Sequence, residues 1–311
     1  MSVIVGNILK RNFSSTTTLN NIVKNVTVIG GGLMGSGIAQ VSAQAGQNVT
    51  VVDVNPDVLK KTEASIQTSI TRVAKKLHKD DTAAAKKFIE ESLSRVKYSP
   101  DAQKAVEQAD LVVEAIVENL DLKHDLFKRL DEAAPAKTLF ASNTSSLSIG
   151  EIASVTKRKD RFGGLHFFNP VPVMRLLEVV RIPETTDDTY EAMMAWGKAI
   201  GKTCITCKDT PGFVVNRLLV PYMAEAMKML ERGDASAEDI DIAMKLGAGY
   251  PMGPFELADY TGLDTGLFIM DGWHKKFPDN ELFNPPEIQR KLVKEGKLGR
   301  KTGEGYYKYT K

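Results

Sequence analysis

Apolar and polar positions along the first two thirds of the chain follow a pattern that predicts strands and helices in turn. A short apolar run over residues 26–29 ends in glycines, a helical pattern covers residues 33–45, and a second apolar run covers residues 48–53. Further strands are predicted at residues 111–116, 138–142, 161–167, 176–181 and 203–206. This alternation is typical of an α/β domain with a doubly wound, Rossmann-type sheet.

Two helical patterns after the second strand predict a helical hairpin inserted into this domain. Asn55 can cap the first helix and Pro56 can begin it, while the second helix follows Asp81 and keeps apolar residues as far as Val96. Roughly forty residues therefore precede the next strand, and a hairpin of that length is expected to project from the sheet. Its tip is basic, through Lys75, Lys76 and Lys79. Composition alone favours a solvated charged face for these lysines.

After Lys208 the strand signals stop and helical patterns take over. They cover residues 213–230, 237–246, 254–260, 265–273 and 286–295. The first of them is apolar on nearly every side, which predicts a central helix or a subunit interface, and Pro221 is expected to kink it. We therefore expect a Rossmann-type domain over residues 22–208 and an all-α second domain over residues 209–311.

The composition of the N-terminal segment differs from that of the rest. The first 52 residues contain no acidic side chain, and Lys10 and Arg11 lie near serines and threonines. This is typical of a mitochondrial transit peptide, which we expect over residues 1–21, with a disordered tail as the alternative. The net charge of +2, with interleaved signs, predicts no nucleic-acid surface. No apolar run approaches the roughly 20 residues of a membrane helix, so no membrane span is expected.

The cysteines and histidines predict neither a redox site nor a metal site. Cys204 and Cys207 are spaced as CxxC, but they lie in a predicted strand, where an offset of three places the thiols on opposite faces. A redox CxxC normally begins a helix, so buried free thiols are favoured. The four histidines are scattered, and no set of His, Cys and carboxylates has the spacing of metal ligands.

Glycines follow the first predicted strand in the pattern GxGxxG, at Gly30, Gly32 and Gly35. Between a strand and a helix this pattern predicts a dinucleotide site, because backbone N–H groups and the helix N-terminus can approach a pyrophosphate. Asp53 ends the second strand, where a carboxylate can bind the adenosine ribose and repel a 2′-phosphate. NAD is therefore favoured over NADP. FAD is the main competitor, because FAD proteins share the fingerprint.

Polar side chains follow two of the later strands, at the edge of the sheet where ligands bind. Glu118 follows one strand, and Asn143, Thr144 and Ser145 follow the next. These groups are expected to lie where a nicotinamide meets its substrate. Short polar residues after a strand are often only helix caps, however, and Ser145 or Ser146 could cap the next helix.

A histidine and a lone carboxylate lie in two apolar strands that follow each other. His166 is at the end of one strand and Glu178 is in the middle of the next, equidistant in sequence from Pro172. A reversal of the chain near Pro172 would bring the two side chains together, and a buried carboxylate needs such a partner. Glu178 could then orient the His166 imidazole as a general base for a hydroxyl group. A purely structural pair is the alternative, and the dinucleotide motif favours catalysis.

Seven segments together resemble the L-3-hydroxyacyl-CoA dehydrogenases of mitochondrial β-oxidation, the short-chain 3-hydroxyacyl-CoA dehydrogenase family. They are GGGLMGSGIAQ, VVEAIVEN, FASNTSSLSI, GLHFFNPVPVM, DTPGFVVNRLL, GYPMGPFELADYTGLD and GRKTGEGYYKY. The match runs in order from about Val26 to Tyr309. The resemblance implies a matrix enzyme that oxidises L-3-hydroxyacyl-CoA to 3-oxoacyl-CoA with NAD, and a homodimer formed through the helical domain.

The resemblance also assigns roles to individual residues. His166 would be the base and Glu178 its partner, with Ser145 and Asn216 completing the catalytic group. The expected NAD contacts are Gly30, Gly31, Gly32, Leu33, Met34, Gly35, Asp53, Glu118, Lys123, Asn143, Ser145 and Lys301. The expected acyl-CoA contacts are Ser69, Lys76, Ser145, Asn169 and Asn216. The contact through Lys76 reverses the interpretation of the basic tip as a solvated face.

Two other functions fit parts of this pattern. A 3-hydroxybutyryl-CoA dehydrogenase working in the reductive direction would share the fold, but Asp53 and the transit-like leader disfavour it. A non-catalytic, crystallin-like NAD-binding protein would also share the fold. That function is disfavoured by the intact catalytic group of His166, Glu178, Ser145 and Asn216, since a purely structural protein needs no buried charged pair.

Overall fold

The computed structural model describes residues 23–309, so the predicted transit peptide over residues 1–21 lies outside the described residues. The chain divides into two compact units between Asp209 and Thr210. The Asp209 carboxylate accepts hydrogen bonds from Ser148 Oγ at 2.6 Å and from the Gly150 N–H at 2.8 Å, so Asp209 is tied to the first unit.

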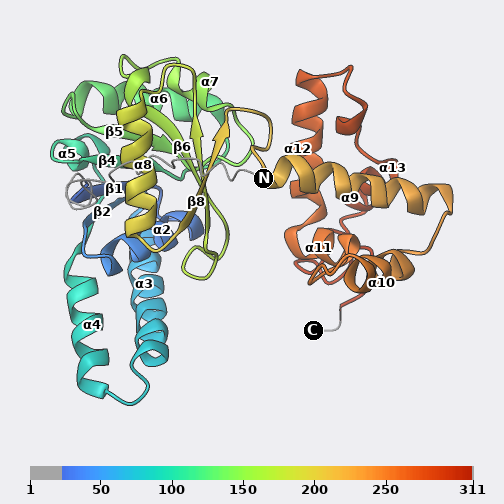
Figure 1. Ribbon diagram of the computed structural model, residues 1–311, viewed down its shortest axis with the longest axis horizontal. Coiled ribbons are helices and arrows are strands. Elements are labelled where there is room, and N and C mark those ends of the chain that lie inside the picture. The colour runs from blue at the N-terminus through green and yellow to red at the C-terminus, as the bar shows by residue number, and fades with distance from the viewer. Residues whose placement is uncertain (1–22, 310–311) are drawn as a thin grey trace, which may run out of the picture. The chain divides into compact units, whose positions relative to one another are not determined.

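Within the described residues of the first unit, eight strands form one sheet in the order β3-β2-β1-β4-β5-β6-β7-β8 (Figure 1). The strands are β1 (Asn25–Ile29), β2 (Asn48–Val52), β3 (Val96–Ser99), β4 (Leu111–Glu114), β5 (Leu139–Ser142), β6 (Phe162–Phe167), β7 (Leu176–Arg181) and β8 (Thr203–Lys208). All neighbours are parallel except β6 and β7, which are antiparallel. The strand order reverses between β1 and β4, the point at which such sheets bind ligands.

Helices cover both faces of this sheet. They are α2 (Leu33–Gln44), α3 (Pro56–Leu77), α4 (Thr82–Ser94), α5 (Ala102–Val106), α6 (Leu120–Ala133), α7 (Ile149–Ala153), the 3₁₀ turn η1 (Lys159–Arg161) and α8 (Asp187–Ala199). On one face, Ile38 of α2, Ile66 of α3 and Trp196 of α8 share a buried core. On the other face, Phe127 of α6 packs against Phe140 and Phe162 of the sheet. Burial on both faces explains why the strands are almost continuously apolar.

The hairpin of α3 and α4 projects from the sheet as predicted, but the sequence prediction of its end was wrong (Figure 1). Val96 does not continue the second helix; it begins β3 and pairs with Val49 of β2. The prediction failed because a strand of four residues with one inward apolar side at Val96 and Tyr98 also fits a helical period. The hairpin therefore connects β2 to an edge strand.

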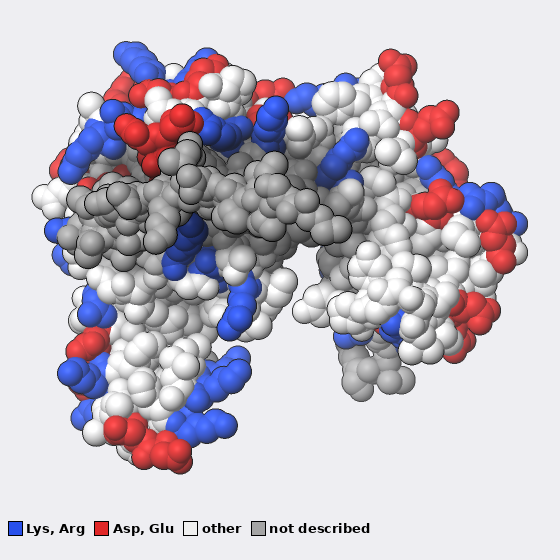
Figure 2. All heavy atoms as spheres, in the orientation of Figure 1, with Lys and Arg blue, Asp and Glu red and all other residues white. Residues whose placement is uncertain are grey.

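The charge at the tip of the hairpin is mixed. The lysines predicted there are exposed, and so are the neighbouring Asp80 and Asp81. Figure 2 shows basic side chains along one side of the hairpin and acidic side chains at its end. The exposed lysines of the tip therefore lie close to exposed carboxylates.

The described part of the second unit is built from helices, followed by a C-terminal segment with two isolated β-bridges, Gly299 to Glu304 and Glu304 to Lys308. Its elements are α9 (Val215–Arg232), α10 (Ala237–Gly247), α11 (Pro254–Thr261), α12 (Leu263–Lys276), the 3₁₀ turn η2 (Glu281–Phe283) and α13 (Glu287–Lys294). Met227, Phe255 and Trp273 are among the residues of its core. The helix α9 is buried on one side only, with Leu218 69% exposed, so of the two predicted roles a subunit interface stays a prediction.

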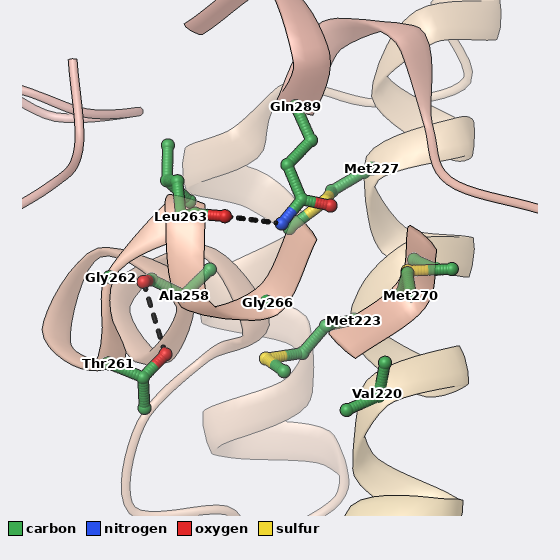
Figure 3. A pocket seen from close by; sticks show the side chains of 11 residues that line it. Val220, Met223, Met227, Ala258, Thr261, Gly262, Leu263, Gly266, Met270 and Gln289 are labelled. Carbon is green, nitrogen blue, oxygen red and sulfur yellow. Dashed lines mark hydrogen bonds between the residues drawn. The ribbon is translucent and has the colours of Figure 1, made fainter. Parts of the chain in front are cut away.

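A small cavity interrupts the core of the second unit. It lies between α9, α11, α12 and Gln289 of α13, whose Nε2 donates to the Leu263 carbonyl at 3.0 Å (Figure 3). Its volume is about 10 Å³, which is the lower limit for a single water molecule. This cavity therefore has no room for a cofactor or an acyl chain.

No helix among residues 23–309 has the length and apolar character needed to cross a membrane.

Candidate functional site

The glycine turn between β1 and α2 has the shape that a dinucleotide requires. Gly30 has a φ of +108°, and a Cβ on it would lie 2.5 Å from the Ala115 carbonyl oxygen. A Cβ on Gly35 would lie 1.8 Å from the Gly30 carbonyl oxygen. A Cβ on Gly32 would meet nothing within 4 Å, so the turn is open on the side where α2 begins. A pyrophosphate can approach the backbone and the helix N-terminus there.

The carboxylate of Asp53 and the hydroxyl of Thr62 hold this turn in place. Asp53 Oδ2 accepts the Gly31 N–H at 2.9 Å, and Thr62 Oγ1 donates to the Gly31 carbonyl at 2.5 Å. A cavity of about 720 Å³ is lined by Gly30, Gly32 and Asp53 and by exposed apolar side chains, among them Val54. Polar groups at the turn and an apolar wall beside them fit the adenosine half of a dinucleotide.

The strand pairing of β6 and β7 builds the predicted acid–base pair. In their antiparallel register His166 lies opposite Glu178. His166 Nδ1 is 2.6 Å from Glu178 Oε2, and the two residues are 3% and 0% exposed. The carboxylate therefore orients the imidazole through Nδ1 and leaves the second ring nitrogen, Nε2, to contact another group.

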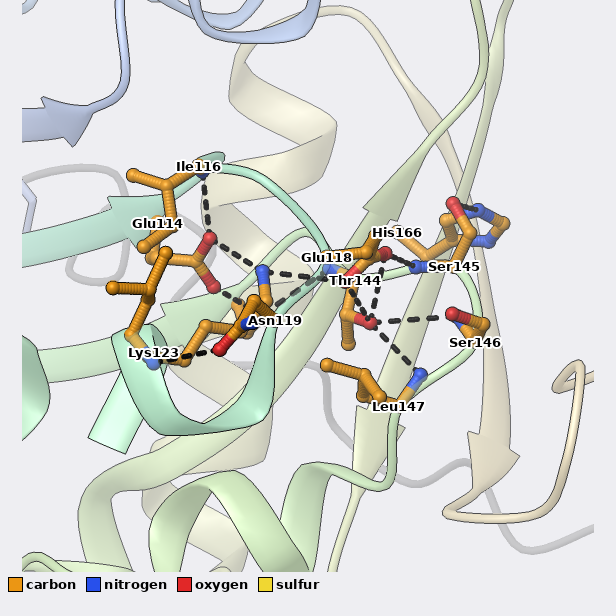
Figure 4. Close-up of polar contacts among 12 residues, drawn as sticks. Glu114, Ile116, Glu118, Asn119, Lys123, Thr144, Ser145, Ser146, Leu147 and His166 are labelled. Carbon is orange, nitrogen blue, oxygen red and sulfur yellow. Dashed lines mark hydrogen bonds and ion pairs between the residues drawn. The ribbon is translucent and has the colours of Figure 1, made fainter. Parts of the chain in front are cut away.

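Ser145 lies at that second nitrogen. Its Oγ is 3.1 Å from His166 Nε2. Its backbone N–H donates to Glu118 Oε1 at 2.8 Å, and Thr144 Oγ1 contacts both oxygens of the same carboxylate at 3.0 Å (Figure 4). The alternative that Ser145 or Ser146 is a helix cap was wrong, because Ser148 caps α7.

A second buried ion pair adjoins this group, and sequence reasoning identified only one half of it. Lys123 of α6 is 1% exposed, and its Nζ lies 2.6 Å from Glu114 Oε1 and 3.4 Å from Glu118 Oε2 (Figure 4). Glu114, the last residue of β4, is fully buried and was missed. The signal was present, since Glu114 is a lone carboxylate in an apolar strand, as Glu178 is.

The remaining predicted residues of the first unit occupy different environments. Asn143 is buried, and its Oδ1 accepts the Phe167 N–H at 2.9 Å, which joins the ends of β5 and β6. Asn169, just after β6, is exposed. On α3, Ser69 is half-buried and Lys76 is exposed.

Two predicted residues lie in the second unit. Asn216 is half-buried in the first turn of α9. Lys301 is close to the C-terminus, and its Nζ forms an ion pair with both carboxylate oxygens of Asp264, at 2.5 and 2.6 Å.

The other three histidines are partly buried. His78, His124 and His274 are half-buried, and His124 Nε2 lies 2.7 Å from the Glu151 carbonyl oxygen. The His78 ring packs against that of Phe88, with centroids 5.7 Å apart. Among residues 23–309, no group of three His, Cys, Asp or Glu side chains could hold a metal ion.

Two protein-family models match the chain over nearly its whole described length. A model of the 3-hydroxyacyl-CoA dehydrogenase NAD binding domain matches residues 25–210. A model of the 3-hydroxyacyl-CoA dehydrogenase C-terminal domain matches residues 212–309.

Individual relatives agree with these models. The mitochondrial hydroxyacyl-coenzyme A dehydrogenase of Homo sapiens is 57% identical over 304 residues, which is 96% of this chain and 97% of that protein. A probable 3-hydroxybutyryl-CoA dehydrogenase of Bacillus subtilis is 44% identical, over 92% of this chain and 98% of that protein. The crystal structure of (S)-3-hydroxybutyryl-CoA dehydrogenase from Ralstonia eutropha superposes with a TM-score of 0.87 at 43% identity, covering 93% of this chain and 100% of that chain.

Proposed function

The chain belongs to the 3-hydroxyacyl-CoA dehydrogenase family, an NAD-dependent group of oxidoreductases that oxidise 3-hydroxyacyl-CoA to 3-oxoacyl-CoA, and from this premise we propose how its residues act. His166 is the general base and Glu178 is its partner. The observation that carries this proposal is the 2.6 Å contact between His166 Nδ1 and Glu178 Oε2, with both residues buried.

The pair supplies the proton acceptor of the reaction. Because Glu178 accepts a hydrogen bond from Nδ1–H, it fixes the tautomer in which Nε2 carries the lone pair. Nε2 takes the proton of the substrate 3-hydroxyl group, and Glu178 stabilises the imidazolium that forms. Ser145 Oγ, 3.1 Å from Nε2, is placed to donate a hydrogen bond to the substrate oxygen. Bound NAD would accept the hydride that leaves the same carbon.

The cofactor would lie along the carboxyl edge of the sheet. The turn from Gly30 to Gly35, with Gly31, Leu33 and Met34, would bind the pyrophosphate, and Asp53 would accept hydrogen bonds from the ribose hydroxyls. The negative charge of Asp53 favours NAD over NADP. Glu118, Lys123, Asn143, Ser145 and Lys301 are the proposed contacts toward the nicotinamide half.

The proposed contacts of the acyl-CoA substrate fall into two groups. Asn169 and Asn216 are proposed partners of the thioester and 3-hydroxyl region. Ser69 and Lys76 are proposed contacts of the CoA moiety, which is anionic and would suit the basic side of α3.

A location is also proposed from the names of relatives, and an assembly from exposed apolar side chains. The Homo sapiens, Rattus norvegicus and Sus scrofa proteins are named mitochondrial, which supports a mitochondrial location, in the matrix, with residues 1–21 as transit peptide. A homodimer through the second unit would cover apolar side chains such as Leu218 and Leu246, which are 69% and 83% exposed.

The reverse reaction gives a direct test of the base. The absorbance of NADH is followed with acetoacetyl-CoA as substrate, in the native chain and in His166→Gln. We expect turnover to fall about 10²- to 10⁴-fold in the variant, the usual contribution of a general base, while NADH binding is retained. Near-normal turnover in His166→Gln would show that the base is another residue.

A further inference from the structure

Glu114 is a fully buried carboxylate with no place in the chemistry described above. It ends β4, and three groups surround it (Figure 4). Its Oε1 accepts hydrogen bonds from Lys123 Nζ at 2.6 Å and the Ile116 N–H at 2.7 Å, and its Oε2 accepts the Ser142 hydroxyl at 2.5 Å. A buried charge with this many fixed partners has one orientation.

Lys123 links Glu114 to a second carboxylate. The ammonium group lies between Glu114 Oε1 at 2.6 Å and Glu118 Oε2 at 3.4 Å, and the lysine itself is 1% exposed. Glu118 lies in the loop between β4 and α6, without strand or helix geometry of its own. The position of its charge therefore depends on where Lys123 is held, and Glu114 holds Lys123.

Glu118 in turn fixes the segment that carries Ser145. Its oxygens contact Thr144 Oγ1 at 3.0 Å and accept the Ser145 N–H at 2.8 Å. These bonds orient the loop so that Ser145 Oγ lies 3.1 Å from His166 Nε2. An unbroken set of contacts therefore runs from Glu114 to the ring nitrogen that receives the proton.

We propose that Glu114 is a positioning residue for the dehydrogenase reaction, acting through Lys123 and Glu118 to hold Ser145 against His166. The inference rests on the proposed role of His166. Glu114 contacts neither substrate nor cofactor in this account. Its effect is to fix the Ser145 hydroxyl, which is proposed to contact the same substrate oxygen as His166. A displacement of such a group by about 1 Å can cost about 100-fold in rate.

The chain offers a matched control for general damage to the fold. Asp131 and Arg158 form another buried ion pair of the first unit, with a distance of 2.5 Å and exposed fractions of 8% and 9%. The guanidinium group of Arg158 donates hydrogen bonds to Asp131 and to carbonyls of the same region, such as that of Pro135. Asp131→Asn should therefore destabilise the unit without disturbing Ser145.

The first measurement compares Glu114→Gln with Asp131→Asn. Glutamine keeps the shape of the side chain and loses its charge. We expect kcat with both substrates saturating to fall about tenfold in Glu114→Gln, with a smaller change in the NADH dissociation constant, and to stay near the native value in Asp131→Asn. An equal loss of kcat in the two variants, or no loss in Glu114→Gln, would overturn the inference.

A double-mutant cycle then tests whether Glu114 acts through Lys123. In a Lys123→Met background, Glu114→Gln should lower kcat no further, and a tenfold loss that persists there would also overturn the inference. Lys123→Met leaves Glu114 buried without a counter-ion; if it does not fold, Glu118→Gln serves as the background. Full kcat in Glu114→Gln beside an inactive His166→Gln contradicts this inference alone, whereas an active His166→Gln contradicts the proposed function.

Discussion

The two ends of the candidate site differ in that one is formed by backbone and the other by side chains. At the glycine turn the backbone makes the site, and Gly30, Gly32 and Gly35 contribute by having no side chain. At the acid–base end, side chains from separate strands make the site. His166 contributes a proton acceptor and Glu178 contributes a charge, and the two are buried together. The first end should be sensitive to added volume and the second to lost charge.

The largest expected effect on cofactor binding is at the backbone-built end. In Gly35→Ala the new Cβ would lie 1.8 Å from the Gly30 carbonyl oxygen, so the turn must move. We expect the displacement of the turn to cost about 3 kcal/mol of binding free energy, a rise of about 100-fold in the NADH dissociation constant. Fluorescence titration with NADH measures this dissociation constant in the native chain and in Gly35→Ala.

Gly32→Ala is the control that sharpens this comparison. Its Cβ would meet nothing within 4 Å, so the melting temperature should stay at the native value. NADH binding should still weaken, because the Cβ would occupy the space in which the pyrophosphate lies. A Gly32→Ala protein that binds NADH normally would contradict the placement of the phosphates at this turn.

The smallest expected effect concerns the thiols of β8, the strand that pairs with β7, which carries Glu178. Burial raises the pKa of Cys207 to about 12, with smaller contributions from Glu178 and Asp209, and burial also raises the pKa of Cys204. With raised pKa values, both cysteines should stay protonated at pH 8. Because only the thiolate reacts, they should react slowly with iodoacetamide in the folded protein. Rapid labelling, or a kcat that responds to dithiothreitol, would revive the redox interpretation of the CxxC spacing.

The two ends also differ in how far sequence could predict them. The glycine turn is local, so GxGxxG after an apolar run was enough. The His166–Glu178 pair was predictable because both residues are equidistant from Pro172, which fixes their register if the chain reverses there. The strand at Val96 was missed, because its pairing with Val49 is decided by tertiary contacts that a short apolar pattern does not encode.

Other parts of the site depend on side-chain packing that no sequence pattern contains. That Ser148 and not Ser145 caps α7 follows from the place where the helix begins, and helix ends are the least predictable feature of a sequence. Glu114 carries the same signal as Glu178, but its partner Lys123 is on a helix whose position relative to β4 is set only in the folded chain.

Replacing Glu178 by glutamine tests the central claim most directly. The amide keeps the volume of the carboxylate at 2.6 Å from His166 Nδ1 but cannot stabilise an imidazolium. The account predicts that kcat for oxidation of 3-hydroxybutyryl-CoA falls by about 100-fold or more, with an unchanged NADH dissociation constant. A Glu178→Gln enzyme with native kcat would contradict it.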